Sequence, residues 1–339
     1  MKNCSKDILK FHADDVTLPK PEQDKVRGNR NANRDRLKRG LDANDKSQPD
    51  EFVIQGSYAM KTMTQHPENG HDIDDGAAFA ASKLKDDKGN DLTPQQAKEM
   101  VRDALIGGGG LKKNPEVKKS CVRVEYAAGH HVDIPVYRVT KTAWGGETKE
   151  LAGESWRDSN PTEITDWFRG EEKKTHKTGE AEPQLRRQVR LIKVYARNNL
   201  GDDALSGLIL TVLTAEKHVA YVEREDRAFR NLIEAVKSRL TWNKTVYNPA
   251  NRSEELTKPA DLEKIKKFIE LIGKSLETLR VLDDADCSQA EAREAWDEVF
   301  TTDYFSKLQS DEQSAKAPYT PSEGYPNKSV NIRGPGTAA

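Results

Sequence analysis

Two aspartates and a glycine–serine pair are the first residues whose types and spacing indicate chemistry. Gly56 and Ser57 end an apolar run, and Asp72 and Asp74 follow after fourteen residues. The alternating sequence HDIDDGAAFAA predicts a strand, in which side chains two positions apart leave the same face. The two carboxylates therefore lie side by side and repel each other unless a cation separates them. Mg²⁺ prefers such carboxylate oxygens, together with phosphate oxygens.

A third aspartate is available in the sequence HVDIPV. Val132, Ile134 and Val136 form one apolar face there, and Asp133 points the other way. If this strand neighbours the first one, three carboxylates converge, enough to hold two metal ions about 3.5–4 Å apart. Asp75 breaks the alternation, and we expect it to support the ligands or a turn rather than to bind metal directly.

The glycine–serine turn predicts a phosphate site. A glycine lets a phosphate approach the backbone, where amide groups and the Ser57 hydroxyl bind its oxygens. Alone, such a pair is only a turn, and a lone Asp-x-Asp is usually a solvated loop or a helix cap. Together they predict a nucleoside triphosphate with its α-phosphate at the metals, attacked by a hydroxyl with pyrophosphate as the leaving group.

Four segments of different character follow one another along the chain. Residues 1–45 are polar, and residues 21–41 predict a charged helix that packs lightly on the body. Residues 46–175 combine alternating runs with a helix, which predicts a mixed sheet. Residues 176–308 carry apolar side chains at three- to four-residue spacing, which predicts an all-helical lobe. Residues 309–339 are polar and rich in Pro, Gly and Ser, which predicts a disordered tail.

Individual elements can be placed within these segments. The sequences EFVIQ and HDIDDGAAFAA predict strands, LTPQQAKEMVRDALIGG a Thr-capped helix, and CVRVEYAAGHHVDIPVYRV a hairpin around Ala-Ala-Gly. In the second half, we expect helices over 183–200, 203–222, 225–240, 261–282 and 289–308. An extended, turn-rich connection, TWNKTVYNPANRSEELTKP, separates the third of these helices from the fourth. The chain is therefore expected to be α+β, with two lobes.

Composition excludes several classes of protein. The 339 residues include 55 Lys and Arg against 56 Asp and Glu, a net charge of −1, so no overall basic field favours nucleic acid. No window approaches the roughly 18 apolar residues of a membrane span, and the N-terminus lacks a signal peptide's apolar core. Cys4, Cys121 and Cys287 are too far apart for a disulfide framework or a cysteine zinc site. We expect a cytoplasmic protein.

The sequence resembles a known enzyme family. Gly-Ser, Asp-x-Asp and a later strand aspartate form the pattern of the polymerase-β-like nucleotidyltransferases. More specifically, QGSYAMKT, HDIDDG and HVDIPVYR resemble the bacterial CD-NTases, relatives of cyclic GMP-AMP synthase and oligoadenylate synthase. The segments WRDSNPTEITDWF, LRRQVRLIKVYAR, LSGLILTVL and NPANRSEEL are also similar, so the resemblance covers most of residues 50–300. It implies an α+β, bilobed enzyme, with a nucleotidyltransferase core, a helical lobe and the active site in the cleft between them.

The resemblance assigns roles to residues of this chain. It implies that Asp72, Asp74 and Asp133 are catalytic and hold two Mg²⁺ ions, for which Mn²⁺ is an alternative. The residues expected to bind nucleotide are those of the turn, a phosphate-contacting lysine, a serine near the donor nucleotide and a lid asparagine that reads the base. In this sequence they are Gln55, Gly56, Ser57, Tyr58, Ala59, Met60, Lys193, Ser206 and Asn251, with Asn248 as the alternative to Asn251.

The residues themselves leave some of these assignments open. Lys193, with Arg186 and Arg190, falls on the flank of a helix that can face the cleft, although solvated charges show the same pattern. Tyr137 stacks on a base or belongs to the core. His71, His130 and His131 flank the aspartates but are not required as bases, because the metals and Asp133 suffice for deprotonation.

The function that the resemblance implies is a synthase of a cyclic second messenger in CBASS anti-phage defence. Such an enzyme joins ATP and GTP, or other nucleoside triphosphates, into a cyclic di- or trinucleotide such as cyclic GMP-AMP. The alternatives are a non-cyclising transferase of the oligoadenylate synthase type and a non-catalytic nucleotide-binding scaffold. Neither the zinc-binding insertion nor the basic surfaces of the animal DNA sensor are present in the sequence, so activation by DNA is not indicated.

The C-terminal residues predict a partner. Gly336-Thr337-Ala338-Ala339 is small and carries no side-chain charge, so it can thread into a narrow adenylating site. It also resembles the C-termini of CD-NTases that a companion ubiquitin-transfer-like enzyme conjugates to other molecules. We therefore expect Ala339 to be a conjugation site that catalysis does not need.

Overall fold

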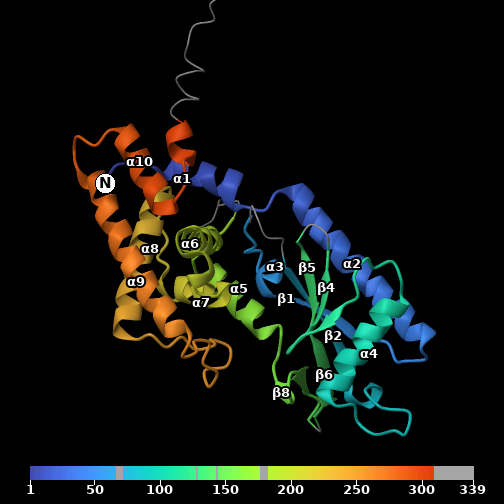
Figure 1. Cartoon of the computed structure of the whole chain (residues 1–339). Coiled ribbons are helices and arrows are strands. Elements are labelled where there is room, and N and C mark those ends of the chain that lie inside the picture. Colours follow the sequence, from blue (N-terminus) through green and yellow to red (C-terminus); the bar gives the residue numbers. More distant parts are fainter. Residues whose placement is uncertain (66–71, 127–128, 143, 176–181, 309–339) are drawn as a thin grey trace, which may run out of the picture.

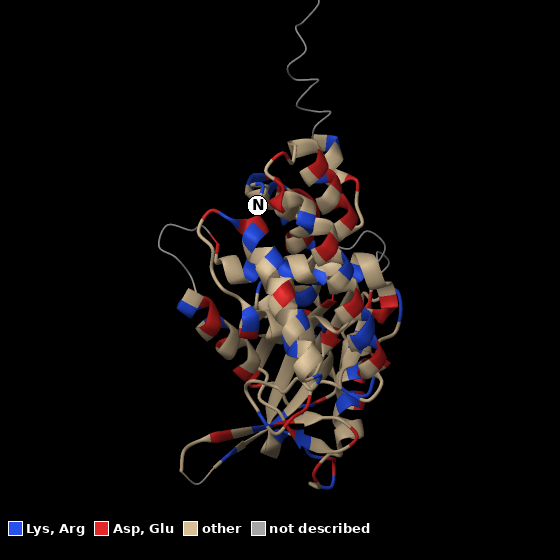
Figure 2. Cartoon of the chain, turned by 90° about the vertical axis from the view of Figure 1, so that its left-hand side faces the viewer, with Lys and Arg blue, Asp and Glu red and all other residues tan. Residues whose placement is uncertain are grey.

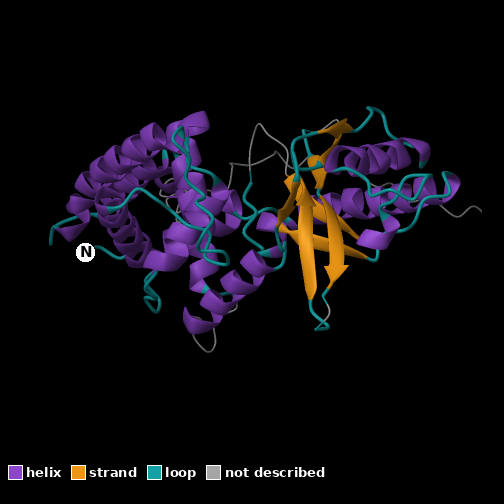
Figure 3. Cartoon of the chain, turned by 90° about the horizontal axis from the view of Figure 1, so that it is seen from below, coloured by secondary structure: helices purple, strands orange, loops and turns teal. Residues whose placement is uncertain are grey.

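The computed structural model describes residues 1–65, 72–126, 129–142, 144–175 and 182–308. The chain forms a lobe built on a sheet and a lobe built of helices (Figure 1). Figure 3, a view from below, shows the strands gathered in the first lobe and most of the helices in the second. The predicted α+β, bilobed architecture is confirmed. The predicted tail with Ala339 and the turn at residues 127–128 lie outside the described residues.

Strand β2 (Asp72–Ala80) pairs with three other strands. It runs antiparallel to β1 (Glu51–Gln55), and it runs parallel to β5 (His131–Ile134) and β6 (Val136–Lys141). The register places Asp74 opposite Asp133 on β5. The predicted neighbourhood of the two aspartate-bearing strands is therefore confirmed.

The remaining strands extend the sheet on both sides. β3 (Glu116–Val117) and β4 (Val122–Glu125) follow β5, and β4 forms the predicted hairpin with it. β7 (Glu147–Ala152) and β8 (Trp156–Asp158) follow β6. Neither of these last two strands was predicted from the sequence.

Two helices cover one face of the sheet. α4 (Pro94–Gly107) begins at Thr93, whose side chain forms the predicted N-terminal cap. α2 (Lys20–Ala43) was expected to pack lightly, but it packs closely along α4. A Cβ atom at Gly40 would lie 1.7 Å from the carbonyl oxygen of Ala104, so only glycine allows the helices to approach this far. Arg34 of α2 also forms an ion pair with the sheet.

Five helices of the second lobe lie within or close to the predicted ranges. They are α6 (Gln184–Leu200), α7 (Gly207–Lys217), α8 (Glu225–Trp242), α9 (Asp261–Thr278) and α10 (Gln289–Phe300). However, α7 and α10 are shorter than the predicted 203–222 and 289–308. Short 3₁₀ turns, η2 (Ala81–Lys83), η3 (Gly201–Asp203) and η4 (Leu279–Asp283), follow β2, α6 and α9. Tyr195, Phe229, Phe268, Trp296 and Phe300 form the aromatic centre of this lobe and are fully buried.

The first residues of the chain belong to the helical lobe. α1 (Ser5–Phe11) continues into the π-helical turn η1 (His12–Val16). Ile8 and Phe11 are buried in the core of that lobe, and the Phe11 ring lies 5.0 Å from that of Phe300. The polar segment 1–45 thus packs on both lobes, through α1 on one and α2 on the other.

The short helix α3 (Gly56–Ala59) and the longer helix α5 (Glu163–Thr175) lie where the lobes meet. α3 follows β1, and α5 follows β8. Met60, Phe168, Leu185 and Val189 form a small buried cluster between α3, α5 and α6. This cluster fixes the turn after β1 against the helical lobe.

The described surface carries both signs of charge. Figure 2 shows Lys and Arg interspersed with Asp and Glu over the face that it presents. This face therefore lacks the single-sign field that binds nucleic acid. In the described part of the chain, no helix is long and apolar enough to cross a membrane.

Candidate active site

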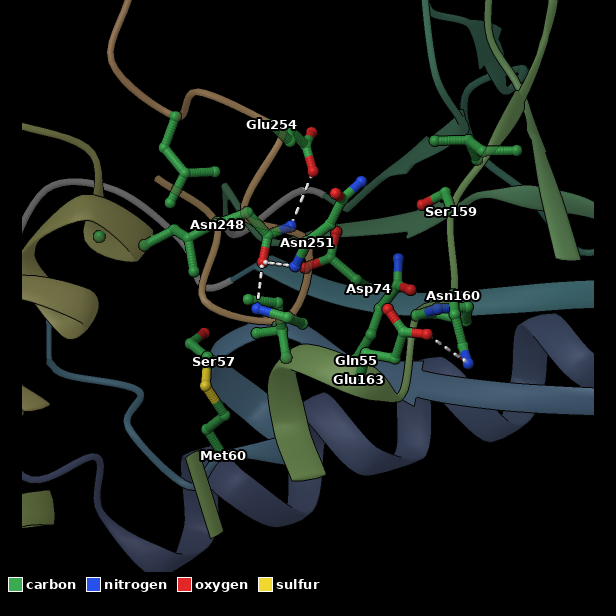
Figure 4. Close-up of a pocket in the computed structure, with 18 of the residues that line it drawn as sticks. Gln55, Ser57, Met60, Asp74, Ser159, Asn160, Glu163, Asn248, Asn251 and Glu254 are labelled. Atoms are coloured by element: carbon green, nitrogen blue, oxygen red, sulfur yellow. Dashed lines mark hydrogen bonds between the residues drawn. The ribbon is translucent and has the colours of Figure 1, made fainter. Parts of the chain in front are cut away.

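A cavity of about 780 Å³ lies between the sheet lobe and the helical lobe (Figure 4). Its walls come from the end of β1 and α3, from β2, from the segment before α5, from α6 and α7, and from the connection between α8 and α9. Six predicted nucleotide-binding residues line it: Gln55, Gly56, Ser57, Met60, Lys193 and Asn251. A cavity of this size has room for at least one nucleotide.

Gly56 shapes the turn at the base of the cavity. Its φ of 66° is in the left-handed region, which favours glycine. A Cβ atom there would lie 2.4 Å from Oδ2 of Asp74, so the glycine also leaves space beside that carboxylate. Ser57 lines the cavity next to it, as the sequence predicted.

We expect Gly56→Ala to destabilise the protein by about 1–3 kcal/mol, because alanine is strained at this φ and its Cβ meets the Asp74 carboxylate. The variant should also lose binding of a non-hydrolysable nucleoside triphosphate. Denaturant unfolding and a binding titration measure the two effects. Gly28→Ala is the control, because nothing lies within 4 Å of its Cβ position in the middle of α2. Unchanged stability and binding in Gly56→Ala would contradict the description of the turn.

Asp74 is a half-buried carboxylate that lines the cavity. Its carboxylate has no hydrogen bond or ion pair with any residue that the structure describes. Burial, followed by repulsion from Asp133 and Asp72, raises its pKa to about 6. The fold thus holds a carboxylate at the cavity in a setting that disfavours its charge.

The two other aspartates have partners. Asp133 accepts two hydrogen bonds from the guanidinium of Arg123, at 2.8 and 2.7 Å. Asp72 lies 2.8 Å from Nδ1 of His131 and is exposed. Neither lines the cavity, and no three acidic, histidine or cysteine side chains in the described part of the chain form a ready metal site. The three aspartates are neighbours, but they do not converge as the sequence analysis expected.

The acidic cluster, Asp72, Asp74 and Asp133, nevertheless suits a divalent cation in its chemistry, although its carboxylates are not arranged as a ready ligand set in the described part of the chain. Asp74 supplies an unpartnered carboxylate at the cavity, and the cluster offers the oxygen ligands that Mg²⁺ prefers. A cation between these carboxylates would remove the repulsion that raises the pKa of Asp74.

Asp75 is not available as a ligand. It is buried, and its two carboxylate oxygens accept hydrogen bonds from Arg34 of α2, at 2.7 and 2.5 Å. The expectation that Asp75 does not bind metal directly agrees with this geometry. Its contact is with a helix on the covered face of the sheet, however, and not with the other aspartates or with a turn.

Lys193 reaches the cavity from α6. Its ammonium donates hydrogen bonds to Oγ1 and to the carbonyl oxygen of Thr62, at 3.1 and 3.3 Å. No carboxylate among the described residues pairs with it. Burial, with a smaller effect of Arg190, lowers its pKa to about 7. Gly207 lies against its stem, since a Cβ there would be 3.4 Å from Cε of Lys193.

Arg186 and Arg190 do not line the cleft beside Lys193, contrary to the expectation. Arg186 pairs with Glu172 of α5, at 2.7 Å. Arg190 is buried and pairs with Glu182, at 2.9 Å. Both cations connect elements of the fold.

Three of the predicted nucleotide-binding residues lie outside the cavity walls. Ser206 caps α7, where its Oγ accepts a hydrogen bond from the amide of Ile209, at 3.3 Å. Tyr58 lines a separate cavity of about 370 Å³, and the guanidinium of Arg30 lies 5.5 Å from its ring centre. Ala59 lies in the turn but does not line the main cavity.

Tyr137 lines the cavity, but its ring is packed into the core of the sheet lobe. The residue is 2% exposed, and it packs with Val53, Ala78 and Leu151. Its hydroxyl donates a hydrogen bond to Oε1 of Gln55, at 2.8 Å. Because the carbonyl oxygen of this amide is occupied, its NH₂ group remains available as a donor at the cavity.

Asn248, Asn251 and Glu254 lie on the connection between α8 and α9 and line the cavity (Figure 4). The side chain of Asn248 donates to Glu254, at 2.7 Å, and accepts from the amide of Ala250. The Asn251 side-chain oxygen accepts from Ser253. Asn248 therefore shapes this loop, whereas the side-chain nitrogen Nδ2 of Asn251 has no protein partner among the described residues.

Six polar lining residues were not selected from the sequence: Asp158, Ser159, Asn160, Glu163, Ser253 and Glu254. The first four lie on the segment that runs from the last residue of β8 to the first residue of α5, and Figure 4 labels Ser159, Asn160 and Glu163 at the cavity. The signal was present in the segment WRDSNPTEITDWF, which resembles the family, but no periodicity distinguishes individual residues of a loop.

Most of the sheet lobe is similar to a known protein family. Residues 50–137 match a family model for the nucleotidyltransferase domain of cyclic GMP-AMP synthase DncV-like proteins. A cyclic GMP-AMP synthase of Escherichia albertii is 27% identical over 220 residues, which cover 62% of this chain and 47% of that protein. The matched region thus spans about half the length of this relative.

Solved structures share the whole fold. The CD-NTase CdnG of Bradyrhizobium diazoefficiens, solved in complex with GTP, matches with a TM-score of 0.68 and 14% identity. That match covers 92% of this chain and 99% of the other. The cyclic AMP-GMP synthase DncV of Vibrio cholerae, in complex with the linear intermediate pppA(3′,5′)pG, gives a TM-score of 0.63 at 18% identity. It covers 84% of this chain and 91% of the other.

Proposed function

The chain is a CD-NTase homologue whose residues 50–137 form a DncV-like nucleotidyltransferase domain, and from this premise we propose that it synthesises a cyclic nucleotide from nucleoside triphosphates. The proposed substrates are ATP and GTP, and the proposed product is a cyclic di- or trinucleotide such as cyclic GMP-AMP. We place this activity in CBASS anti-phage defence, with Ala339 as a site of conjugation.

One observation carries the proposal. The cavity presents a carboxylate without a cationic partner, Asp74, and an ammonium without an anionic partner, Lys193, among the described residues. Burial raises the pKa of Asp74 and lowers the pKa of Lys193, so in both groups it disfavours the charged form. A triphosphate with its divalent cations supplies the charge that each side chain lacks, because phosphates pair with the ammonium and cations with the carboxylate.

The residues of the cavity divide the work of binding. Ser57 and the turn at Gly56 hold phosphate oxygens, and Lys193 neutralises their charge from the helical lobe. Asp72, Asp74 and Asp133 would hold two Mg²⁺ ions, which Mn²⁺ could replace. When bound, these ions lower the pKa of the attacking ribose hydroxyl and stabilise the leaving pyrophosphate.

Ring closure needs the same residues twice. After the first transfer, the linear intermediate must turn in the cavity so that its own triphosphate occupies the turn at Ser57. The volume of about 780 Å³ supports this rearrangement. The DncV structure with a linear intermediate supports a two-step synthesis in a protein of the same fold.

Pyrophosphate release tests the proposal against a non-catalytic scaffold. Purified protein, Mg²⁺ and the four ribonucleoside triphosphates should release pyrophosphate continuously. Omission of individual nucleotides identifies the required substrates. A protein that binds nucleotides but releases no pyrophosphate under any combination would support the scaffold.

Triphosphate binding should weaken as pH rises above about 7. Lys193 has a lowered pKa of about 7 in the nucleotide-free protein, so it is increasingly neutral at higher pH and must take up a proton to pair with phosphate. We expect the dissociation constant of a non-hydrolysable triphosphate to rise by up to about tenfold per pH unit between pH 7.5 and 9.

Lys193→Arg is the matched control for this pH dependence, since arginine stays charged throughout the range. Its binding curve should be flat over the same interval. Calorimetric titrations at a series of pH values measure both proteins. A flat curve for the wild-type protein would contradict the role of Lys193 as a phosphate partner.

A further inference from the structure

Arg123 is the counter-charge of the acidic cluster. It lies on β4 directly opposite Asp133 on β5, and it donates two parallel hydrogen bonds to that carboxylate. The Asp133 side chain is only 12% exposed, so the pair is largely shielded from solvent. Both oxygens of the third aspartate are therefore occupied in the protein without a cation.

The influence of Arg123 extends beyond its partner. Its positive charge also acts on Asp72 and on Asp74, where it opposes the repulsion between the carboxylates. Arg123 thus reduces the net charge of three carboxylates from −3 to −2. Asp72 has its own contact, with the ring of His131.

We propose that Arg123 is an internal counter-ion that lowers the affinity of the acidic cluster for a free divalent cation, so that tight cation binding requires the triphosphate as well. This inference rests on the proposed function, since the acidic cluster is a metal site only in that function. Arg123 holds Asp133 in place. Its charge also offsets part of the repulsion between the three carboxylates when no cation is bound. The negative charge of a bound triphosphate offsets the guanidinium and adds phosphate oxygens as ligands.

The same sheet contains a similar cross-strand ion pair that lies away from the acidic cluster. Arg138 on β6 lies opposite Glu150 on β7 and pairs with it at 2.8 Å. The side chains of that pair are 22% and 27% exposed, and the strands that carry it do not bear the three aspartates. Arg138→Gln therefore removes the same kind of cross-strand ion pair without changing the charge of the acidic cluster.

Binding of Mn²⁺ without nucleotide tests the proposal. Free Mn²⁺ is measured by electron paramagnetic resonance during titration of the wild type, Arg123→Gln, Arg123→Lys and Arg138→Gln. We expect Arg123→Gln to bind Mn²⁺ about tenfold more tightly, because a unit positive charge beside the site is removed. Arg123→Lys keeps that charge and should stay within about twofold of the wild type, as should Arg138→Gln.

Three results would overturn the proposal. Unchanged or weaker Mn²⁺ binding by Arg123→Gln would show that Arg123 does not oppose the cation. Equal tightening in Arg138→Gln would show a general effect of losing an ion pair. If circular dichroism shows that Arg123→Gln does not fold, the Arg123→Lys variant decides. Mn²⁺ binding more than about fivefold weaker in Arg123→Lys than in the wild type would show that the two hydrogen bonds to Asp133, and not the positive charge, control Mn²⁺ affinity.

Failure of this inference can be distinguished from failure of the proposed function. The titration contains no nucleotide and requires no turnover. Tightened Mn²⁺ binding in a protein that forms no product would uphold Arg123 as a counter-ion and reject the synthase. An active synthase whose Mn²⁺ affinity is the same with and without Arg123 would uphold the proposed function and reject Arg123 as a counter-ion.

Discussion

The double variant Asp72→Ala, Asp74→Ala should lose product formation by about 10³-fold or more and yet unfold at the same or a higher temperature than the wild type. Asp74 is a half-buried carboxylate whose pKa is raised to about 6, so its charge opposes folding at neutral pH. Because the folded pKa lies above the unfolded value, this penalty is present above pH 6 and disappears on acidification. Removal of the Asp74 carboxylate therefore increases the free energy of unfolding by up to about 3 kcal/mol at pH 7. Calorimetry and a product assay measure the two effects.

Asp75→Asn is the matched control for the double variant. Asp75 is the next residue of the same strand, but its carboxylate is paired with Arg34. Removing that charge leaves a partly buried guanidinium without its partner, so the variant should unfold at a lower temperature. Its activity per folded molecule should remain near that of the wild type. Ordinary product formation by the double variant, or its complete loss in folded Asp75→Asn, would contradict the assignment of the aspartates.

Lys193→Met should have the second largest effect, a loss of about 10²-fold in the use of triphosphate. Methionine retains the packing of the stem against Gly207 but removes the charge that pairs with phosphate. Burial of an ammonium without a carboxylate is unfavourable, so stability at pH 7 should hold or rise despite the lost hydrogen bonds to Thr62. Steady-state kinetics with each nucleotide and thermal unfolding measure both effects.

An exposed lysine provides the control for Lys193→Met. Lys266 on α9 is 56% exposed and pairs with Glu263 of the same helix. Lys266→Met should leave both kinetics and stability nearly unchanged. Equal kinetics in Lys193→Met and Lys266→Met would show that Lys193 does not act on the triphosphate.

The sequence was most informative where a residue pattern has a fixed period. The two-residue period of β2 placed Asp72 and Asp74 together, and the three- to four-residue spacing located all five helices from α6 to α10. β7 and β8 were missed because only the last two residues of β7 are buried, so no apolar alternation marks them.

Contacts between distant residues could not be predicted. The pair of Arg123 with Asp133 depends on the register of a hairpin, and the close packing of α2 depends on Gly40 meeting Ala104. Ser206 shows a different difficulty, since a serine before a helix is both a cap and a plausible phosphate contact. Only the geometry of the cavity separates these uses.

Chromatography of the reaction products tests the central claim most directly. Wild-type protein and the Asp72→Ala, Asp74→Ala variant are incubated with Mg²⁺ and each radiolabelled ribonucleoside triphosphate in the presence of the other three. Products are then separated before and after phosphatase treatment. We predict phosphatase-resistant products from the wild type, which are cyclic, and none from the variant. Products that phosphatase degrades completely would show a non-cyclising transferase, and resistant products from both proteins would contradict the proposed active site.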